Sequence, residues 1–218
     1  MGEAEIAELL PRRRPAQERS RRRFDEILRA ARALLVEVGF EAFTADQVAL
    51  RAGVPIGSLY QFFGNKYAIV CELDRIDTAN IRKELESFAA EIPSLDWAQL
   101  LEKMLDHLAV AWRTDPSRRV VWLAMQATPT TRVIAAQHER ELASDVTRLL
   151  APLTPGSPMA DREVVAEVLV HVSYSMLNFS IRDGQSHPQA IEELKRLVIG
   201  YLHVAEHEAA DRRATGGE

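Results

Sequence analysis

The chain has 218 residues, of which 47% are hydrophobic and 27% are charged, a composition typical of a globular protein with an apolar core. It contains no run of 18 apolar residues, which excludes a membrane-spanning helix, and its single cysteine, Cys71, excludes an intramolecular disulfide. The first residues lack the basic start and apolar stretch of a secretory signal, so we expect the protein to be cytoplasmic.

The charges are distributed unevenly along the chain. The formal net charge is −5, yet residues 10–66 carry 11 Lys and Arg against 6 Asp and Glu, whereas residues 67–218 carry 16 against 23. A basic N-terminal part concentrates the attraction for phosphate at one end of the chain. This pattern favours a nucleic-acid partner, but arginine clusters are also common on solvated surfaces, so charge alone does not decide between the two.

The first forty residues predict a basic segment followed by a long helix. Residues 1–16 contain two prolines and the arginines from Arg12 to Arg14, so we expect a disordered basic arm. From about residue 17 to Val38, apolar residues recur every three or four positions, which predicts an amphipathic helix. Gly39 is suited to the left-handed backbone position that follows a helix end.

Two short helices are expected next. Thr44 and Gln47 match a capping box, in which the Thr hydroxyl accepts from an early backbone N–H and the Gln side chain reaches back. Gly53 stops this helix, and Pro55 suits the first turn of the following one, at about residues 56–62. Three helices joined in this way have the spacing of a helix-turn-helix, whose last helix enters a DNA major groove about 12 Å wide.

The remainder of the chain predicts helix after helix, separated at Pro and Gly residues, without a convincing strand pattern. Asn65 can cap the first of these helices. The expected helices cover residues 66–90, 95–113, 115–125, 131–150, 161–183 and 188–208, and residues 211–218 are expected to form a disordered tail.

The stretch from Thr44 to Lys66 resembles the signature of the tetracycline-repressor (TetR) family, and the preceding helix with its Gly39-Phe40 ending is similar too. The resemblance is specific over residues 20–70. It implies an all-α fold with an N-terminal three-helix helix-turn-helix DNA-binding domain at residues 17–66. A C-terminal helical ligand-binding and dimerisation domain would follow at residues 67–210.

The resemblance also assigns roles at the DNA. Thr44 and Tyr60 would contact phosphates through their hydroxyls, and Lys66 would do so through its ammonium group. Gln61 suits adenine and Ile56 suits a thymine methyl group, whereas the arginines of the arm and of the first helix would meet phosphates or the minor groove. The expected DNA-binding residues are Arg22, Arg23, Thr44, Ile56, Gly57, Ser58, Tyr60, Gln61 and Lys66.

Some of these residues also have a purely structural interpretation. Thr44 can act only as a helix cap, and Tyr60 and Phe62 can be plain core aromatics, which for Phe62 is the preferred interpretation. Two departures from the family pattern leave the operator sequence open: Pro55 offers no capping side chain where Ser is frequent, and Gln61 replaces a frequent aromatic residue or His.

The last two expected helices carry broad apolar faces, which can pack within one subunit or against a second copy. In the resembled family they would form a four-helix dimer bundle, and a two-fold dimer would match a palindromic operator. We therefore expect a homodimer through these helices. The apolar positions are Val164, Val165, Val168, Leu169, Val172, Met176 and Phe179 in one helix, and Ile191, Leu194, Leu197, Val198, Tyr201, Leu202 and Ala205 in the other.

An effector pocket would be mostly apolar with a few polar anchors. Aromatic residues and methionines of the C-terminal helices suit such a pocket, although at helical spacing they are equally typical of a core. The expected ligand-binding residues are Met104, His107, Trp112, Trp122, Met125, Gln126, Tyr174, Asn178 and Phe179.

The resemblance implies a repressor that binds a palindromic operator as a dimer and leaves it when a small, largely apolar effector binds. The alternative is a DNA-binding regulator without such an effector, either an activator or one controlled by a protein partner. An enzyme is disfavoured because the chain has no nucleophile elbow, phosphate-binding loop or zinc motif, and no cofactor is expected. His203 and His207 have metal-ligand spacing but lie in a polar stretch, which favours a solvated helix face.

Overall fold

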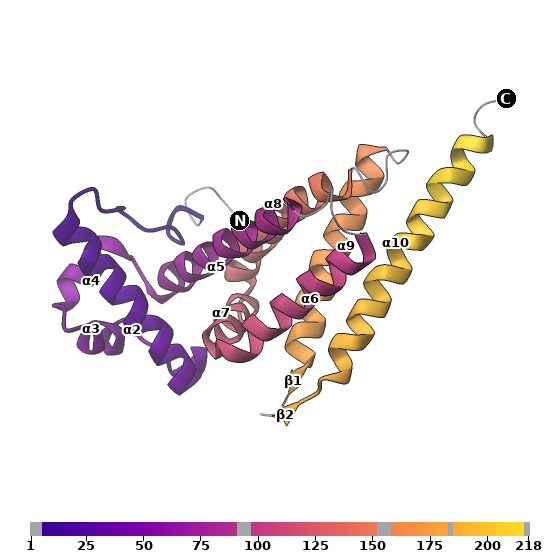
Figure 1. The fold of residues 1–218 in the computed structure, drawn as a ribbon. Helices are drawn as coiled ribbons and strands as arrows, with labels where there is room; N and C mark the ends of the chain where they lie inside the picture. The colour runs from indigo at the N-terminus through magenta and orange to yellow at the C-terminus, as the bar shows by residue number, and fades with distance from the viewer. Residues whose placement is uncertain (1–5, 91–96, 152–157, 183–184, 216–218) are drawn as a thin grey trace. The chain divides into compact units, whose positions relative to one another are not determined.

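The computed structural model describes residues 6–90, 97–151, 158–182 and 185–215. Their architecture is helical, which confirms the all-α prediction (Figure 1). Among these residues, no helix is long and apolar enough to cross a membrane. The helices are α2 (Glu18–Ala42), α3 (Ala45–Ala52), α4 (Ile56–Phe62), α5 (Lys66–Ala89), α6 (Trp97–Thr114), α7 (Pro116–Gln126), α8 (Pro129–Leu150), α9 (Met159–Phe179) and α10 (Gln189–Thr215).

Several element boundaries differ from the sequence predictions. Helix α8 begins at Pro129 itself, because proline is tolerated in the first turn of a helix. Helix α9 ends at Phe179, and two short antiparallel strands, β1 (Ile181–Arg182) and β2 (Gln185–Ser186), follow where the sequence predicted no strand. Helix α10 continues to Thr215, so residues 211–215 are helical and the prediction of a disordered tail is wrong for them.

The chain forms two compact units. The first unit comprises residues 1–79 and 115–138, and the second comprises residues 80–114 and 139–218. The first unit is larger than the predicted DNA-binding domain, because α7 packs against α2. Through that packing Met125 joins the apolar core of the first unit and is completely buried.

The caps predicted around the short helices are present. The backbone N–H of Gln47 donates to Thr44 Oγ1 at 3.3 Å, and the N–H of Thr44 donates to Gln47 Oε1 at 3.2 Å. Gly39 and Gly53 have φ of 71° and 65°, the left-handed region that glycine adopts without strain. Asn65 accepts from a backbone N–H of the first turn of α5 at 2.9 Å, so its predicted capping role is confirmed.

A layer of polar contacts joins α2, α5, α7 and α8 within the first unit. The guanidinium of Arg32 donates to the two carboxylate oxygens of Asp77 at 2.7 and 3.0 Å and to Ser117 Oγ at 3.1 Å. Burial raises the pKa of Asp77, and the hydrogen bond from Arg32 opposes that rise. His138 Nδ1 lies 2.6 Å from a carboxylate oxygen of Asp74. These contacts fix the middle of α5 against α2, the first helix of the helix-turn-helix, and against α8.

The second unit has a core of its own. Helices α9 and α10 pack against each other, and α10 also packs against α6. Lys195 on α10 ties these helices further, because its ammonium lies 2.6 Å from Asp106 on α6. The buried apolar residues of this core are Ile81, Leu85, Leu101, Leu105, Leu142, Ala143, Leu150, Ala166, Leu169, Val170, Leu194, Val198 and Leu202.

Candidate nucleic-acid interface

Helix α4 has the two sides that a recognition helix requires. Leu59 and Phe62 are buried at 0% and 3% exposure, and Phe63, directly after the helix, is completely buried. The aromatic ring of Phe63 stacks on Phe24 of α2 at a centroid distance of 4.9 Å. This inward side holds α4 against the rest of the first unit and leaves its other side available.

The residues of α4 predicted to contact DNA, Tyr60 at phosphate and the others at bases, lie on that other side. Tyr60 is 39% exposed and Ile56 is 36% exposed. Gly57 and Gln61 are exposed as well, and Ser58 is half-buried. One apolar, one small and three polar residues are thus displayed together, which is the mixture that major-groove contacts use.

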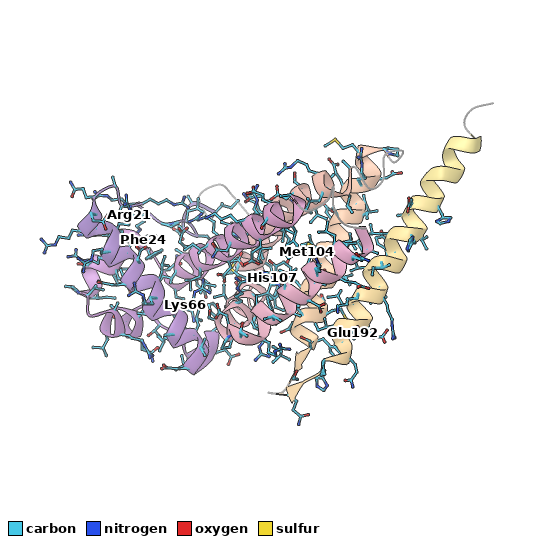
Figure 2. All side chains as sticks on the ribbon, in the orientation of Figure 1. Arg21, Phe24, Lys66, Met104, His107 and Glu192 are labelled. Carbon is cyan, nitrogen blue, oxygen red and sulfur yellow. The ribbon has the colours of Figure 1, made fainter. Side chains whose placement is uncertain are left out.

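Two of the predicted phosphate-binding groups are already engaged within the chain. The Lys66 ammonium, labelled in Figure 2, donates to the backbone oxygens of Phe40 and Phe43 at 3.2 Å each and lies 4.6 Å from the centre of the Phe40 ring. The Thr44 hydroxyl donates to Gln47 Oε1 at 3.0 Å while it caps α3. In the structure these two side chains hold the end of α2 and the start of α3.

The arginines at the start of α2 remain at the surface. Arg22 is exposed and Arg23 is half-buried. The neighbouring Arg21, labelled in Figure 2, donates to Glu18 at 3.2 Å. These residues can add positive charge beside α4, in the way that phosphate contacts position a protein on a duplex.

A surface ion pair links α2 to α3 in the same unit. The guanidinium of Arg51 donates two hydrogen bonds to the carboxylate of Glu37. Those hydrogen bonds lower the pKa of Glu37. Both side chains are substantially exposed, so solvent screens the pair.

The N-terminal segment departs most from the prediction. Residues 6–16 pack within the first unit and are not a free arm, because Leu9 is only 3% exposed within the apolar core. The backbone N–H of Arg12 donates to the Phe62 oxygen at 2.8 Å, and the Arg12 guanidinium donates to the Tyr60 oxygen at 3.2 Å. No spacing rule in the sequence indicates this contact between residues about 50 positions apart.

The residues predicted to bind an effector divide between the two units. In the second unit, Met104 and Tyr174 are half-buried against the same apolar core, and Trp112 lies edge-on to Tyr174 at 6.0 Å. His107, one turn along α6 from Met104 (Figure 2), is half exposed and lies 3.4 Å from Glu84. Phe179, at the end of α9, is 46% exposed.

The other predicted effector residues are Trp122, Met125 and Gln126 of the first unit and Asn178 of α9. Trp122, Gln126 and Asn178 are half-buried, whereas Met125 is a core residue with no exposed surface. Residue type alone therefore does not separate pocket from core.

One groove of about 270 Å³ is described in the second unit, between α8 and α9. None of the nine predicted effector residues lines it; its lining combines both signs of charge with a few small residues. The lining residues are Arg140, Ala143, Ser144, Thr147, Arg148, Met159, Glu163 and Glu167. In the described parts of the chain, no group of three or more His, Cys, Asp or Glu could hold a metal ion.

Two family models match the chain. Residues 27–73 match the model of bacterial regulatory proteins of the tetR family, and residues 95–205 match the tetracyclin repressor-like C-terminal domain. The chain is 22% identical over 174 residues to the HTH-type transcriptional regulator BetI of Vibrio campbellii. That match covers 80% of this chain and 86% of the relative.

Solved structures resemble the fold over most of its length. A TetR-family transcriptional regulator from Streptomyces coelicolor is 27% identical with a TM-score of 0.65, over 84% of this chain and 99% of that chain. The regulator FadR from Bacillus subtilis, solved in complex with stearoyl-CoA, has a TM-score of 0.67 at 15% identity, over 80% of this chain and 97% of that chain. Since the C-terminal model alone spans about half of the chain and the other model covers the helix-turn-helix, this protein belongs to the TetR family of transcriptional regulators.

Proposed function

We propose that the protein is a ligand-responsive repressor that binds a palindromic operator as a homodimer and leaves it when a small, largely apolar effector binds. The observation that carries the DNA-binding part is the orientation of α4. Its apolar residues Leu59 and Phe62 are buried, whereas Ile56, Tyr60 and Gln61 face outward. A short helix held in this way can present its outer residues to base edges in a major groove.

The outer rows of α9 and α10 support the proposed dimer. On α9, Val164 and Val168 are 60% and 39% exposed at a spacing of four residues. On α10, Leu197, Tyr201 and Val204 are 53%, 37% and 56% exposed at spacings of four and three. Each helix thus buries one apolar row inside the second unit and leaves another outside. A second copy would cover the outer rows through a two-fold interface.

Helix α5 supplies a physical route from effector to DNA. Three residues separate its start from the end of α4, and its residues belong to both compact units. We infer that an effector bound among Met104, Trp112 and Tyr174 changes the packing of α5, and that this change alters the separation of the two recognition helices in the dimer. The stearoyl-CoA complex of the Bacillus subtilis regulator supports a largely apolar effector, since it places an acyl chain in a protein of this fold.

The first test is the selection of bound sequences from a random pool of duplex DNA with the purified protein. We expect a palindrome with half-sites about one helical turn apart, because a two-fold dimer places its recognition helices in successive major grooves. Binding without any enriched sequence would contradict the proposal, and so would a non-palindromic site occupied by one monomer.

The second test concerns the effector. Compounds are first selected because they raise the melting temperature of the purified protein. The affinity of the protein for the selected operator is then measured with and without each compound. We expect a loss of about 5- to 150-fold, the usual range of coupling between two sites. A bound compound that leaves the affinity unchanged would favour a regulator without a small-molecule effector.

A further inference from the structure

The recognition helix α4 is held weakly by its own residues. It has seven residues, its N-cap Pro55 provides no side-chain hydrogen bond, and its last turn contains no basic residue. The last four carbonyl groups of a helix have no partner within it, and a helix of this length is not stable alone in water. Other segments must therefore fix the orientation of α4.

The N-terminal segment fixes its C-terminal end. Phe62 O accepts the backbone N–H of Arg12 at 2.8 Å, and Tyr60 O accepts the Arg12 guanidinium at 3.2 Å. Leu59 O accepts the backbone N–H of Phe63 at 2.9 Å. Arg12 thus satisfies two of the terminal carbonyl groups, and its positive charge lies at the negative end of the helix dipole.

The same segment is anchored on both sides of Arg12. Leu9 is buried in the core of the first unit at 3% exposure. Asn65, which caps α5, donates through Nδ2 to the Glu8 oxygen at 3.2 Å. On the other side, Arg14 donates at 3.2 Å to the carboxylate of Glu72, whose side chain is 3% exposed. Four independent contacts along residues 8–14 therefore hold this segment, which we call the strap, across the end of α4.

We propose that the strap positions the recognition helix and that Arg12 is the positioning residue for its last turn, the turn that carries Tyr60 and Gln61. The proposal rests on the DNA-binding function proposed above. Arg13 provides the comparison, because it is exposed and makes no described side-chain contact with α4. Both arginines attract DNA through charge, but only Arg12 holds the reading helix in place.

The test compares Arg12→Ala with Arg13→Ala, which each remove one positive charge from the strap. Affinity is measured for the selected operator and for a random duplex across a salt series. Arg13→Ala is expected to weaken both complexes by the same factor, as loss of a charge does. Arg12→Ala is expected to lower the ratio of operator to random affinity by about fivefold, because misplaced base contacts lose specificity. Arg12→Lys, which keeps the charge and a donor, is expected to restore part of that ratio.

Gly64 offers a variant that keeps all charges. A Cβ atom at Gly64 would lie 3.1 Å from Arg12 Nε and 3.2 Å from Nη2, so in Gly64→Ala the guanidinium must shift by a few tenths of an ångström, which strains its bond to Tyr60 O. We expect Gly64→Ala to lower the affinity ratio on its own and to have no further effect in the Arg12→Ala background. Thermal unfolding of each variant verifies that the first unit remains folded.

Amide hydrogen exchange without DNA gives a second readout. Residues 58–63 are expected to exchange faster in Arg12→Ala and unchanged in Arg13→Ala, since only the former removes the guanidinium bond to Tyr60 O, while the backbone bond from residue 12 to Phe62 O remains in both variants. Equal affinity ratios in the two variants, or equal exchange, would overturn the positioning role. Failure of the unaltered protein to enrich any DNA sequence would instead contradict the proposed function and leave the exchange experiment to decide on the strap.

Discussion

The large apolar side chains of the two compact units differ in where they lie. In the first unit, Phe24, Phe43 and Phe63 are at most 6% exposed, and apart from Ile56 and Tyr60 on the outer side of α4, the exposed apolar residues, such as Leu50, are spread over several helices. In the second unit, exposed apolar residues recur at helical spacing along α9 and α10. Scattered apolar residues are normal on a surface, whereas contiguous ones indicate a binding surface. The first unit therefore buries its large aromatic side chains within one chain, whereas the outer rows of α9 and α10 suit the dimer interface proposed above.

The largest expected effect comes from opening the core of the first unit. Phe63 is completely buried and stacks on Phe24, so Phe63→Ala should cost about 3–5 kcal/mol of unfolding free energy through lost burial and a residual cavity. The measurement is urea unfolding followed by circular dichroism. Leu50→Ala is the control: Leu50 is 82% exposed, so a change within about 0.5 kcal/mol is expected. A similar small loss for Phe63→Ala would mean that this core is not closed.

The thiol of Cys71 tests whether the same core excludes solvent. Burial raises the pKa of Cys71 to about 12, with smaller contributions from the nearby carboxylates Asp74 and Glu72. Because the thiolate is the reactive form, we expect a thiol reagent at pH 8 to modify the native protein roughly a thousandfold more slowly than an ordinary exposed cysteine. The reaction rate is followed through the absorbance of the chromophore that the thiol reagent releases. Addition of urea should raise the rate to that of an exposed cysteine. Rapid modification in native buffer would contradict a closed core.

The features that the sequence predicted correctly depend on neighbours a few residues apart. The capping box at Thr44, the glycine conformations at Gly39 and Gly53, and the inward Leu59 all follow from local hydrogen bonding, backbone sterics or helical period. Such signals are confined to one turn or one helix. They were sufficient to place the helix-turn-helix and the outward side of α4.

The features that the sequence did not predict depend on contacts between distant positions. The strap reaches α4 from about 50 residues away, and no periodicity marks Arg12 apart from Arg13. The position of Lys66 in the family signature predicts a phosphate contact, but its hydrogen bonds to two carbonyl oxygens arise only from the folded path of the chain. The residue type of Met125 predicts a place in the effector site, but it lies in the core because α7 packs on α2.

A substitution in the outer row of α10 tests the proposed dimer interface of the second unit. Leu197→Asp places a charge in the proposed dimer interface, where it would lose its water, so we expect the dimer to dissociate roughly 100-fold more readily. Analytical ultracentrifugation measures the dissociation constant, and operator affinity should fall with it. Val110→Asp on α6 is the matched control, since Val110 is 47% exposed outside the proposed interface. If the dimer dissociation constant is unchanged in both variants, the outer rows would instead bind another partner.

The smallest expected effect concerns the surface of the first unit. Hydrogen bonds from Arg51 lower the pKa of Glu37, so the pair stabilises the folded state above the ordinary carboxyl pKa, and this contribution is lost as pH falls through the lowered value. Arg51→Gln should therefore reduce the urea midpoint slightly at pH 7, and the difference from the unaltered protein should close in acid. Arg29→Gln on the exposed side of α2 serves as the control for loss of one charge. A large loss at pH 7 that persists in acid would mean that the Arg51 side chain acts through packing, and that the first unit depends on its surface as well as on its core.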